Sequence, residues 1–312
     1  MVKISLYTIL HSNELVVRGY KPENIRQKLI ELLGNSEDGM SGIEISEKLA
    51  INRITMTKYL KVFAAEGFLR QKNIGNLTLW FLEPGQESYE FPSDYFKVAT
   101  EYLDILLKRN ESQALSLIKN CVHSGASPSR LVVEVMLPAV NVIQKMYDDG
   151  KIGASEKKLL QNTVSRSFHM FTQIQTEPDP KKNIVVIAAD PESILFSEAA
   201  SASFYSDGWR VFHLGDMSSA INILFDLDLQ KMMGKIWKQR SGVMVVVVFS
   251  NSEEGLNFFA DSIMSVKEKL SKKIKIGLCG KTGKKTKIPS DLLSEKFETV
   301  LQWAETVYET SK

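Results

Sequence analysis

The chain has 312 residues, 44% of them apolar and 24% charged, and 39 basic against 37 acidic residues give a net charge of +2. This length accommodates two or three domains, and the composition is that of a soluble globular protein, not of a disordered or fibrous one. The two cysteines do not have metal-ligand spacing, and no apolar run approaches the roughly 20 residues of a membrane span. The sequence also has no signal pattern. We therefore expect a cytoplasmic protein without membrane contact.

Residues 1–85 have the pattern of a small DNA-binding head. The first 20 residues are ambiguous and could form an arm used in dimer contacts. Ser41 with Glu44 three residues later is a capping box, which predicts where the second helix begins. The predicted elements are helices over residues 22–34, 41–50 and 53–66, and a hairpin of residues 68–72 and 77–82. Three helices followed by a hairpin are the winged helix-turn-helix pattern.

Positive charge in this head is concentrated on the third helix and the hairpin. Between residues 52 and 76 five basic residues stand against Glu66 alone, although residues 1–90 hold equal numbers of each sign. Residues expected to seat the third helix in the core are Ile54, Tyr59, Leu60, Phe63 and Ala64. Residues predicted to contact DNA are Asn52, Arg53, Thr55, Thr57, Lys58, Lys61, Lys72 and Asn73. The alternative is a winged-helix module that binds only protein.

Residues 93–175 are predicted to be helical throughout. Amphipathic stretches cover residues 93–109, 111–124, 128–147 and 154–175. Short connections between helices of this length favour an antiparallel four-helix bundle. Polar, proline-containing linkers over residues 86–92 and 177–182 separate this part from its neighbours.

Residues 183–312 predict a doubly wound parallel sheet. An apolar, β-branched strand over residues 183–189 leads through a turn to a helix over 194–207 and a second strand over 209–215. Further strands are predicted over residues 242–249 and 273–279, with helices over about 220–239, 255–270 and 290–308. Ligands of such sheets bind in the crevice beyond the carboxyl ends of the strands, so the site is expected at residues 190–193 and 216–219.

This C-terminal part resembles the cobalamin-binding domain of corrinoid proteins. Leu214-Gly215 at the end of the second strand and Trp209-Arg210-Val211 at its start carry the resemblance. The helical part is similar to the cap of methionine synthase and of light-sensing cobalamin repressors, on the strength of Met136-Leu137-Pro138-Ala139, Gly150-Lys151-Ile152 and Ser155-Glu156. The order of the three parts matches those repressors, which implies a transcriptional regulator with a sensory half of cobalamin-binding type.

The residues that would contact cobalamin have changed. The family loop carries a His within an Asp/Glu-x-His-x-x-Gly pattern, whereas here Ile194 takes the place of the His and Ser197 that of the Gly. Isoleucine has no lone pair to give a metal. Tyr147 takes the place of the cap Trp, and Lys157 and Lys158 that of a Glu-His pair. The resemblance therefore implies a degenerate or repurposed module whose cobalamin-ligating motif is lost.

The candidate crevice still has polar residues. Asp190 and Glu192 could contact a polar ligand, although Asp190-Pro191 equally suits a turn. The third and fourth strands end in Ser250-Asn251-Ser252 and Cys279-Gly280, where the family has Ser-x-Leu and Gly-Gly. The candidate cofactor-binding residues are Tyr147, Asp190, Glu192, Ser193, Ile194, Leu214, Gly215, Ser250 and Gly280.

No catalytic or metal site is predicted. The histidines are scattered over His11, His123, His169 and His213, and of these His169 could point into a cleft. Residues 277–282 have too few residues between their glycines for a P-loop. Seven lysines and no acid between residues 272 and 287 suit a solvated face, with a contact to DNA backbone or an anion as the alternative.

We therefore predict a non-enzymatic transcriptional regulator that binds double-stranded DNA as a homodimer, with no resident cofactor and with room for an unidentified small-molecule ligand. One alternative is a cobalamin-dependent photosensor that binds the corrinoid without a lower His ligand. The other is a corrinoid methyl carrier, which the missing His and the DNA-binding head disfavour.

Overall fold

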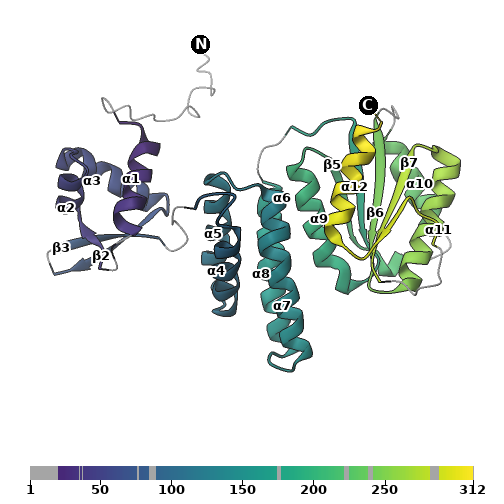
Figure 1. Cartoon of the computed structure of the whole chain (residues 1–312), viewed down its shortest axis with the longest axis horizontal. Helices are drawn as coiled ribbons and strands as arrows, with labels where there is room; N and C mark the ends of the chain where they lie inside the picture. The colour runs from purple at the N-terminus through teal and green to yellow at the C-terminus, as the bar shows by residue number, and fades with distance from the viewer. Residues whose placement is uncertain are drawn as a thin grey trace, which may run out of the picture. The chain divides into compact units, whose positions relative to one another are not determined.

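The computed structural model describes residues 20–34, 36, 38–75, 77–83, 89–173, 177–220, 225–237, 242–281 and 288–311. Residues 1–19 of the expected N-terminal arm, residues 86–88 of the first linker, and residues 282–287 of the lysine-rich segment lie outside these ranges. The chain divides into two compact units, Met1–Tyr89 and Glu90–Lys312, drawn in purple to blue and in teal to yellow (Figure 1). In the described part, no helix is both long and apolar enough to span a membrane.

The first unit consists of three helices and a three-stranded antiparallel sheet. Its elements are α1 (Pro22–Gly34), β1 (Met40–Ser41), α2 (Gly42–Lys48), α3 (Arg53–Ala65), β2 (Leu69–Ile74) and β3 (Leu77–Leu82). The sheet order is β1-β3-β2, so β3 lies in the middle. The predicted capping box is confirmed: Ser41 Oγ accepts from the Glu44 amide at 3.2 Å, and the Glu44 carboxylate accepts from the Ser41 amide at 2.7 Å.

The inward face of α3 differs from the prediction at its first turn. Ile54 is 71% exposed, whereas Met56 is completely buried in the core of this unit. Helical periodicity explains the difference, because Met56, Leu60 and Phe63 are spaced four and three apart and share one face. Ile54 lies two residues before Met56, about 200° round the helix, and so faces solvent.

The second unit begins with a helical part. Its segments are α4 (Tyr95–Leu107), α5 (Glu111–His123), α6 (Pro128–Leu131), the π-helical η1 (Val132–Met136), α7 (Leu137–Asp148) and α8 (Ala154–Phe171). One predicted helix, residues 128–147, thus forms three consecutive segments without a break. Pro138 accounts for the π turn, since it has no amide hydrogen and its ring crowds the carbonyl four residues earlier.

A five-stranded sheet forms the rest of the second unit. Its strands are β4 (Lys182–Ala188), β5 (Arg210–Asp216), β6 (Val243–Phe249), β7 (Ile274–Cys279) and β8 (Leu292–Ser294). They run parallel in the order β5-β4-β6-β7-β8. The connecting helices are η2 (Pro191–Ser193), α9 (Ile194–Ser206), η3 (Ser218–Ala220), α10 (Phe225–Ile236), α11 (Glu253–Leu270) and α12 (Phe297–Glu309).

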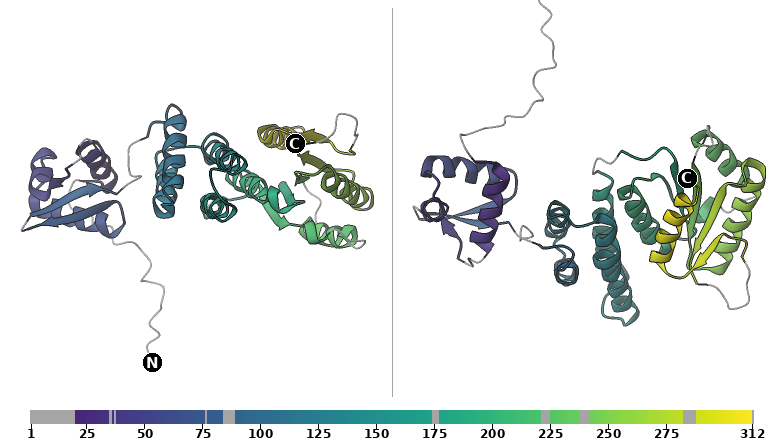
Figure 2. Two further views of the ribbon diagram at one scale, coloured as in Figure 1. Left: turned by 90° about the horizontal axis from the view of Figure 1, so that it is seen from below. Right: turned by 45° about the horizontal axis from the view of Figure 1, so that its top comes forward.

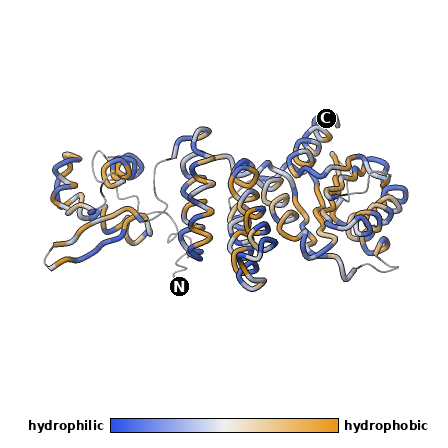
Figure 3. Tube along the Cα trace, turned by 60° about the horizontal axis from the view of Figure 1, so that its bottom comes forward, coloured by the Kyte–Doolittle hydropathy of each residue, from blue (hydrophilic) through white to orange (hydrophobic). Residues whose placement is uncertain are grey.

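Two layers of helix cover this sheet. Helices α9 and α12 lie on one face, and α10 and α11 cover the other (Figure 1). Every residue of β6 is buried, and the strands form an apolar centre between more polar helices (Figure 3). The prediction of one long helix over residues 290–308 is wrong, because Leu292–Ser294 extends the sheet as β8 before α12 begins. Likewise the described residues of the predicted helix over 220–239 form η3 and a shorter helix, α10.

Helix α9 is packed on two sides. One side lies against β4 and β5, and the other against α6 and α8 of the helical part (Figure 2). Its middle is made of small residues, and Ala199, Ala200, Ala202 and Ser203 are buried. Small side chains let a helix approach its neighbours closely on every side. The helical part and the sheet therefore share α9 as a common interface.

Candidate functional site

The N-terminus of α3 holds several of the predicted DNA-contacting residues. Asn52 is the N-cap of the helix, and its side-chain oxygen accepts from the Ile54 amide at 2.9 Å. The Thr57 hydroxyl donates to the Arg53 carbonyl at 2.8 Å. Asn52 and Thr57 thus support the helix through these bonds, and Thr55 and Thr57 are half-buried.

The outer face of α3 is basic with an apolar element. Arg53, Lys58 and Lys61 are exposed, and Ile54 lies among them. Glu66, the one acid between residues 52 and 76, forms an ion pair with Arg26 of α1. Its charge is therefore partly compensated within this unit. Sequence reasoning missed Ile54 as a surface residue because its apolar character suggested the core.

The hairpin contributes a second group of exposed residues. All of β2 after Leu69 is exposed, including Lys72 and Asn73. The Asn73 side chain accepts from the Thr78 hydroxyl at 2.9 Å across the hairpin. The Lys72 ammonium is left to solvent or to a polyanion.

At the carboxyl ends of the parallel strands, Asp190 joins two loops. One of its carboxylate oxygens accepts from the Ser193 amide at 2.9 Å and the Ser193 hydroxyl at 2.6 Å. The other accepts from the Ser250 hydroxyl at 2.8 Å and the Asn251 amide at 2.7 Å. A carboxylate offers about four lone-pair sites, so these four donors occupy it. Asp190 fastens the loop after β4 to the loop after β6 and has little capacity left for a ligand.

Backbone packing closes the same region. A Cβ added to Gly280 would stand 2.1 Å from the Ser250 carbonyl oxygen, so only glycine fits there. Gly215 has a φ of 69°, which favours glycine, yet nothing lies within 4 Å of the position a Cβ would take. Glu192 is exposed, and Leu214 packs partly into the core under α10 and α11. The predicted crevice residues after β4 and β6 therefore mainly hold the loops together. At the end of β5, the space beside Gly215 is open.

The residues present do not fit cobalamin with an axial imidazole from the loop after β4. Ile194 is the first residue of α9, directly after η2, so a short turn takes the place of a ligand loop. Ser197 is buried, donates to the Ile194 carbonyl at 2.8 Å and lies 2.9 Å from His213 Nε2. On the cap side, the Lys157 ammonium lies 4.5 Å from the centre of the Tyr147 ring. A cation thus lies over one face of the Tyr147 ring.

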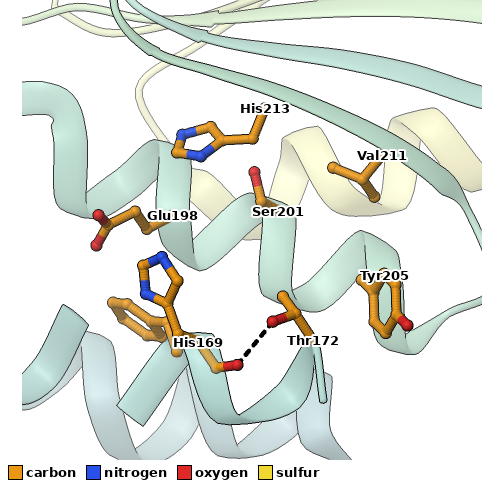
Figure 4. A pocket seen from close by; sticks show the side chains of 8 residues that line it. His169, Thr172, Glu198, Ser201, Tyr205, Val211 and His213 are labelled. Carbon is orange, nitrogen blue, oxygen red and sulfur yellow. Dashed lines mark hydrogen bonds between the residues drawn. The ribbon is translucent and has the colours of Figure 1, made fainter. Parts of the chain in front are cut away.

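A separate pocket of about 290 Å³ lies between the end of α8, the middle of α9 and the first half of β5 (Figure 4). Its lining residues are Phe168, His169, Thr172, Glu198, Ser201, Tyr205, Val211 and His213. Burial and the neighbouring His169 lower the pKa of His213, which favours its neutral imidazole. Sequence reasoning considered His169 for a cleft but did not bring these residues together, because they come from three elements.

The parallel strand order and the helices on both faces make the C-terminal sheet a doubly wound, Rossmann-like fold. The structure of the monomethylamine corrinoid protein of Methanosarcina barkeri is similar, with a TM-score of 0.53 and 12% identity over 68% of this chain and 98% of that one. A cobalamin-binding protein of Desulfitobacterium hafniense DCB-2 gives a TM-score of 0.34 and 11% identity over 67% and 98% of the two chains. At such identities the likeness concerns the fold alone.

Comparison of the sequence with known proteins does not assign the chain to a family. No protein-family model matches the chain. Protein BNI1 of Saccharomyces cerevisiae is 26% identical over 156 residues, which are 49% of this chain but 8% of BNI1. The chain thus spans a small fraction of that relative's length.

Proposed function

We propose that this protein is a DNA-binding transcriptional regulator, in which a winged helix-turn-helix head is joined to a repurposed sensory module of cobalamin-binding fold. The observation that carries the proposal is the outer face of α3. Arg53, Lys58 and Lys61 are exposed there, and the exposed strand β2 adds Lys72 within the same unit. Clustered cations on one helix and an adjacent hairpin suit a helix in the major groove and a wing on the backbone.

The residues of this face divide by chemistry. Arg53 at the start of α3 can form two hydrogen bonds to a guanine edge, and Ile54 can contact a thymine methyl group. Lys58, Lys61 and Lys72 suit phosphates, which position the head without reading sequence. An exposed isoleucine between cations favours a base-reading surface over a merely solvated helix.

Binding of the full-length protein to fluorescent double-stranded DNA tests the proposal. We expect anisotropy to rise with protein at 50 mM salt. The slope of log affinity against log salt should be about −3 for each head, from roughly three phosphates neutralised by Lys58, Lys61 and Lys72. A protein that shows no binding to mixed-sequence duplexes at low salt would contradict DNA binding and favour a protein-binding head.

A homodimer is part of the proposal. A single head offers few base contacts, whereas paired heads on a two-fold site add their contacts and fix the half-site spacing. Light scattering at micromolar concentration should give about twice the mass of the 35.2 kDa chain. A strict monomer, with and without DNA, would count against it.

The fold itself favours a second candidate, a cobalamin-dependent sensor, because the similar solved structure is that of a corrinoid protein. The lack of a ligating side chain at Ile194 opposes it. We expect no stoichiometric co-elution of hydroxocobalamin or adenosylcobalamin with the protein on gel filtration. Stoichiometric co-elution would restore this candidate, and co-elution with the visible spectrum of a His-ligated corrinoid would restore the methyl carrier as well.

A further inference from the structure

The pocket between α8, α9 and β5 is distinct from the crevice of the sheet. Val211 and His213 belong to the first part of β5, whereas the crevice residues Leu214 and Gly215 follow towards its carboxyl end. In the described sheet β5 is an edge strand, so its side chains towards α9 and α8 bound a space that no other described strand borders. The pocket thus belongs to the joint between the helical part and the sheet.

Hydrogen bonds fix the tautomer of His169. Its Nδ1 lies 2.7 Å from the Ser165 carbonyl oxygen. A carbonyl oxygen only accepts, so Nδ1 must carry the hydrogen. In the neutral ring Nε2 then has a free lone pair. In Figure 4 the ring extends from α8 towards His213.

The tautomer of His213 follows from the direction of the Ser197 hydroxyl. With its single hydrogen on the Ile194 carbonyl at 2.8 Å, this hydroxyl accepts from His213 Nε2 at 2.9 Å. The lone pair of the neutral ring is therefore on Nδ1. The two imidazoles face one another across the pocket (Figure 4), and each retains one unused acceptor.

The remaining polar groups also offer acceptors. The Thr172 hydroxyl donates to the His169 carbonyl at 2.7 Å, and the Ser201 hydroxyl donates to the Ser197 carbonyl at 2.8 Å. One carboxylate oxygen of Glu198 is buried without any hydrogen-bond partner. Apart from the Tyr205 phenol, the pocket therefore presents lone pairs and one negative charge, beside the apolar side chains of Phe168 and Val211.

We propose that this pocket binds a small primary amine in its protonated form. An ammonium group has three donors and no acceptor, which complements the Glu198 carboxylate and the two imidazole lone pairs. The alkyl part would lie against Phe168 and Val211. A metal ion fits less well: among the described residues no three His, Cys, Asp or Glu side chains form a metal-binding group, and about 290 Å³ far exceeds one ion.

The site has a consequence that rests on the proposed function. Its walls come from α8 of the helical part and from α9 and β5 of the sheet, so a bound amine bridges the two. A ligand that binds one arrangement of such a joint more tightly than another shifts the equilibrium towards it. The amine is thereby the ligand class of the sensory module.

Long-range proton–nitrogen spectra of the imidazoles in the full-length protein test the site directly. We expect n-propylamine hydrochloride at pH 7.5 to shift the His169 and His213 signals with saturation on the order of 1 mM, as suits a ligand of four heavy atoms. His123 on α5 is the internal control and should not shift. Glu198→Gln, which keeps the shape and removes the charge, should weaken binding about tenfold or more.

Two further probes on the wild-type protein keep the proposal open to refutation even if Glu198→Gln fails to fold. Tetramethylammonium has the charge but no N–H donor, and n-propanol has no charge. Each should therefore need at least a 50-fold higher concentration than n-propylamine to saturate the site. Equal responses to all three, or no saturable shift at all, would overturn the amine site. Stoichiometric Zn²⁺ binding with these ring shifts, without an amine response, would replace it with a metal site.

The effect of the amine on DNA binding is measured in a separate experiment. With ionic strength held constant by NaCl, saturating n-propylamine should change DNA affinity at least threefold in wild type and not in Glu198→Gln. Amine binding in a protein that binds no DNA would keep the pocket and overturn the proposed function. Amine binding with unchanged DNA affinity would keep the pocket and overturn its sensory role.

Discussion

Replacing Asp190 with alanine should lower the free energy of unfolding of the unit Glu90–Lys312 by about 3 kcal/mol, since hydrogen bonds to a charged group contribute roughly 1.5–3 kcal/mol each and are not additive. The substitution removes the acceptor for the Ser193 and Asn251 amides and for the hydroxyls of Ser193 and Ser250. Ser250 is 2% exposed, so water cannot fully replace the lost partner. Urea denaturation followed by tryptophan fluorescence measures the change.

Glu192→Ala is the matched control for this prediction. Glu192 is also an acid of the crevice loop, two residues away, but it is exposed. Its removal should change the unfolding free energy by less than about 0.5 kcal/mol, as is usual for surface sites. Equal effects of the two substitutions would show that Asp190 does not fasten the two loops together.

The Asp190 bonds bear on function as well as on stability. In a doubly wound sheet the carboxyl ends of the two strands flanking the switch in strand order form the ligand crevice. Here those strands are β4 and β6, and the loops after them are tied to one another through one side chain. A loop fixed in this way is poorly suited to rearrange around a corrin ring, which agrees with the absence of an imidazole at Ile194.

The sequence allowed the sheet to be predicted wherever a strand is long and fully buried. β4 and β6 are largely apolar runs of seven residues rich in β-branched side chains, and this length and composition favour a buried strand over a helix. β8 was missed because three residues at a sheet edge carry no usable periodicity, and the apolar pair Leu292-Leu293 continues smoothly into the pattern of α12. The π turn before α7 was likewise invisible, although Pro138 marks its cause.

Less of the candidate sites could be predicted. The exposed basic residues of α3 could be predicted from their charge alone. That Ile54 faces solvent could not, because it depends on which face of the helix packs on the core. The facing pair His169 and His213 is separated by 44 residues and joined by α9 packing on both elements, so no spacing rule could find it. The role of Asp190 depends on the loop after β6, some 60 residues away, and only the fold brings the two together.

The second large effect expected is on DNA binding by α3. Arg53→Ala should remove about 1–3 kcal/mol of discrimination between a preferred site and a scrambled duplex, because a paired contact to a guanine edge is lost. Lys61→Ala should weaken all duplexes alike and reduce the salt slope by about one, because it removes a phosphate contact and releases one counterion fewer. Anisotropy titrations at four salt concentrations separate these two behaviours.

Two lysines outside this surface serve as controls for charge alone. Lys28→Ala changes the same charge on an exposed position of α1 in the same unit, and Lys273→Ala changes it in the lysine-rich segment of the other unit. Both should leave the slope and the site preference nearly unchanged, because neither residue lies on α3 or the hairpin. If Lys273→Ala weakened binding as much as Lys61→Ala, the DNA interface would have to include the second unit. If Arg53→Ala lowered affinity without altering preference, Arg53 would be a phosphate contact, and base reading would pass to Ile54 and the other residues of that face.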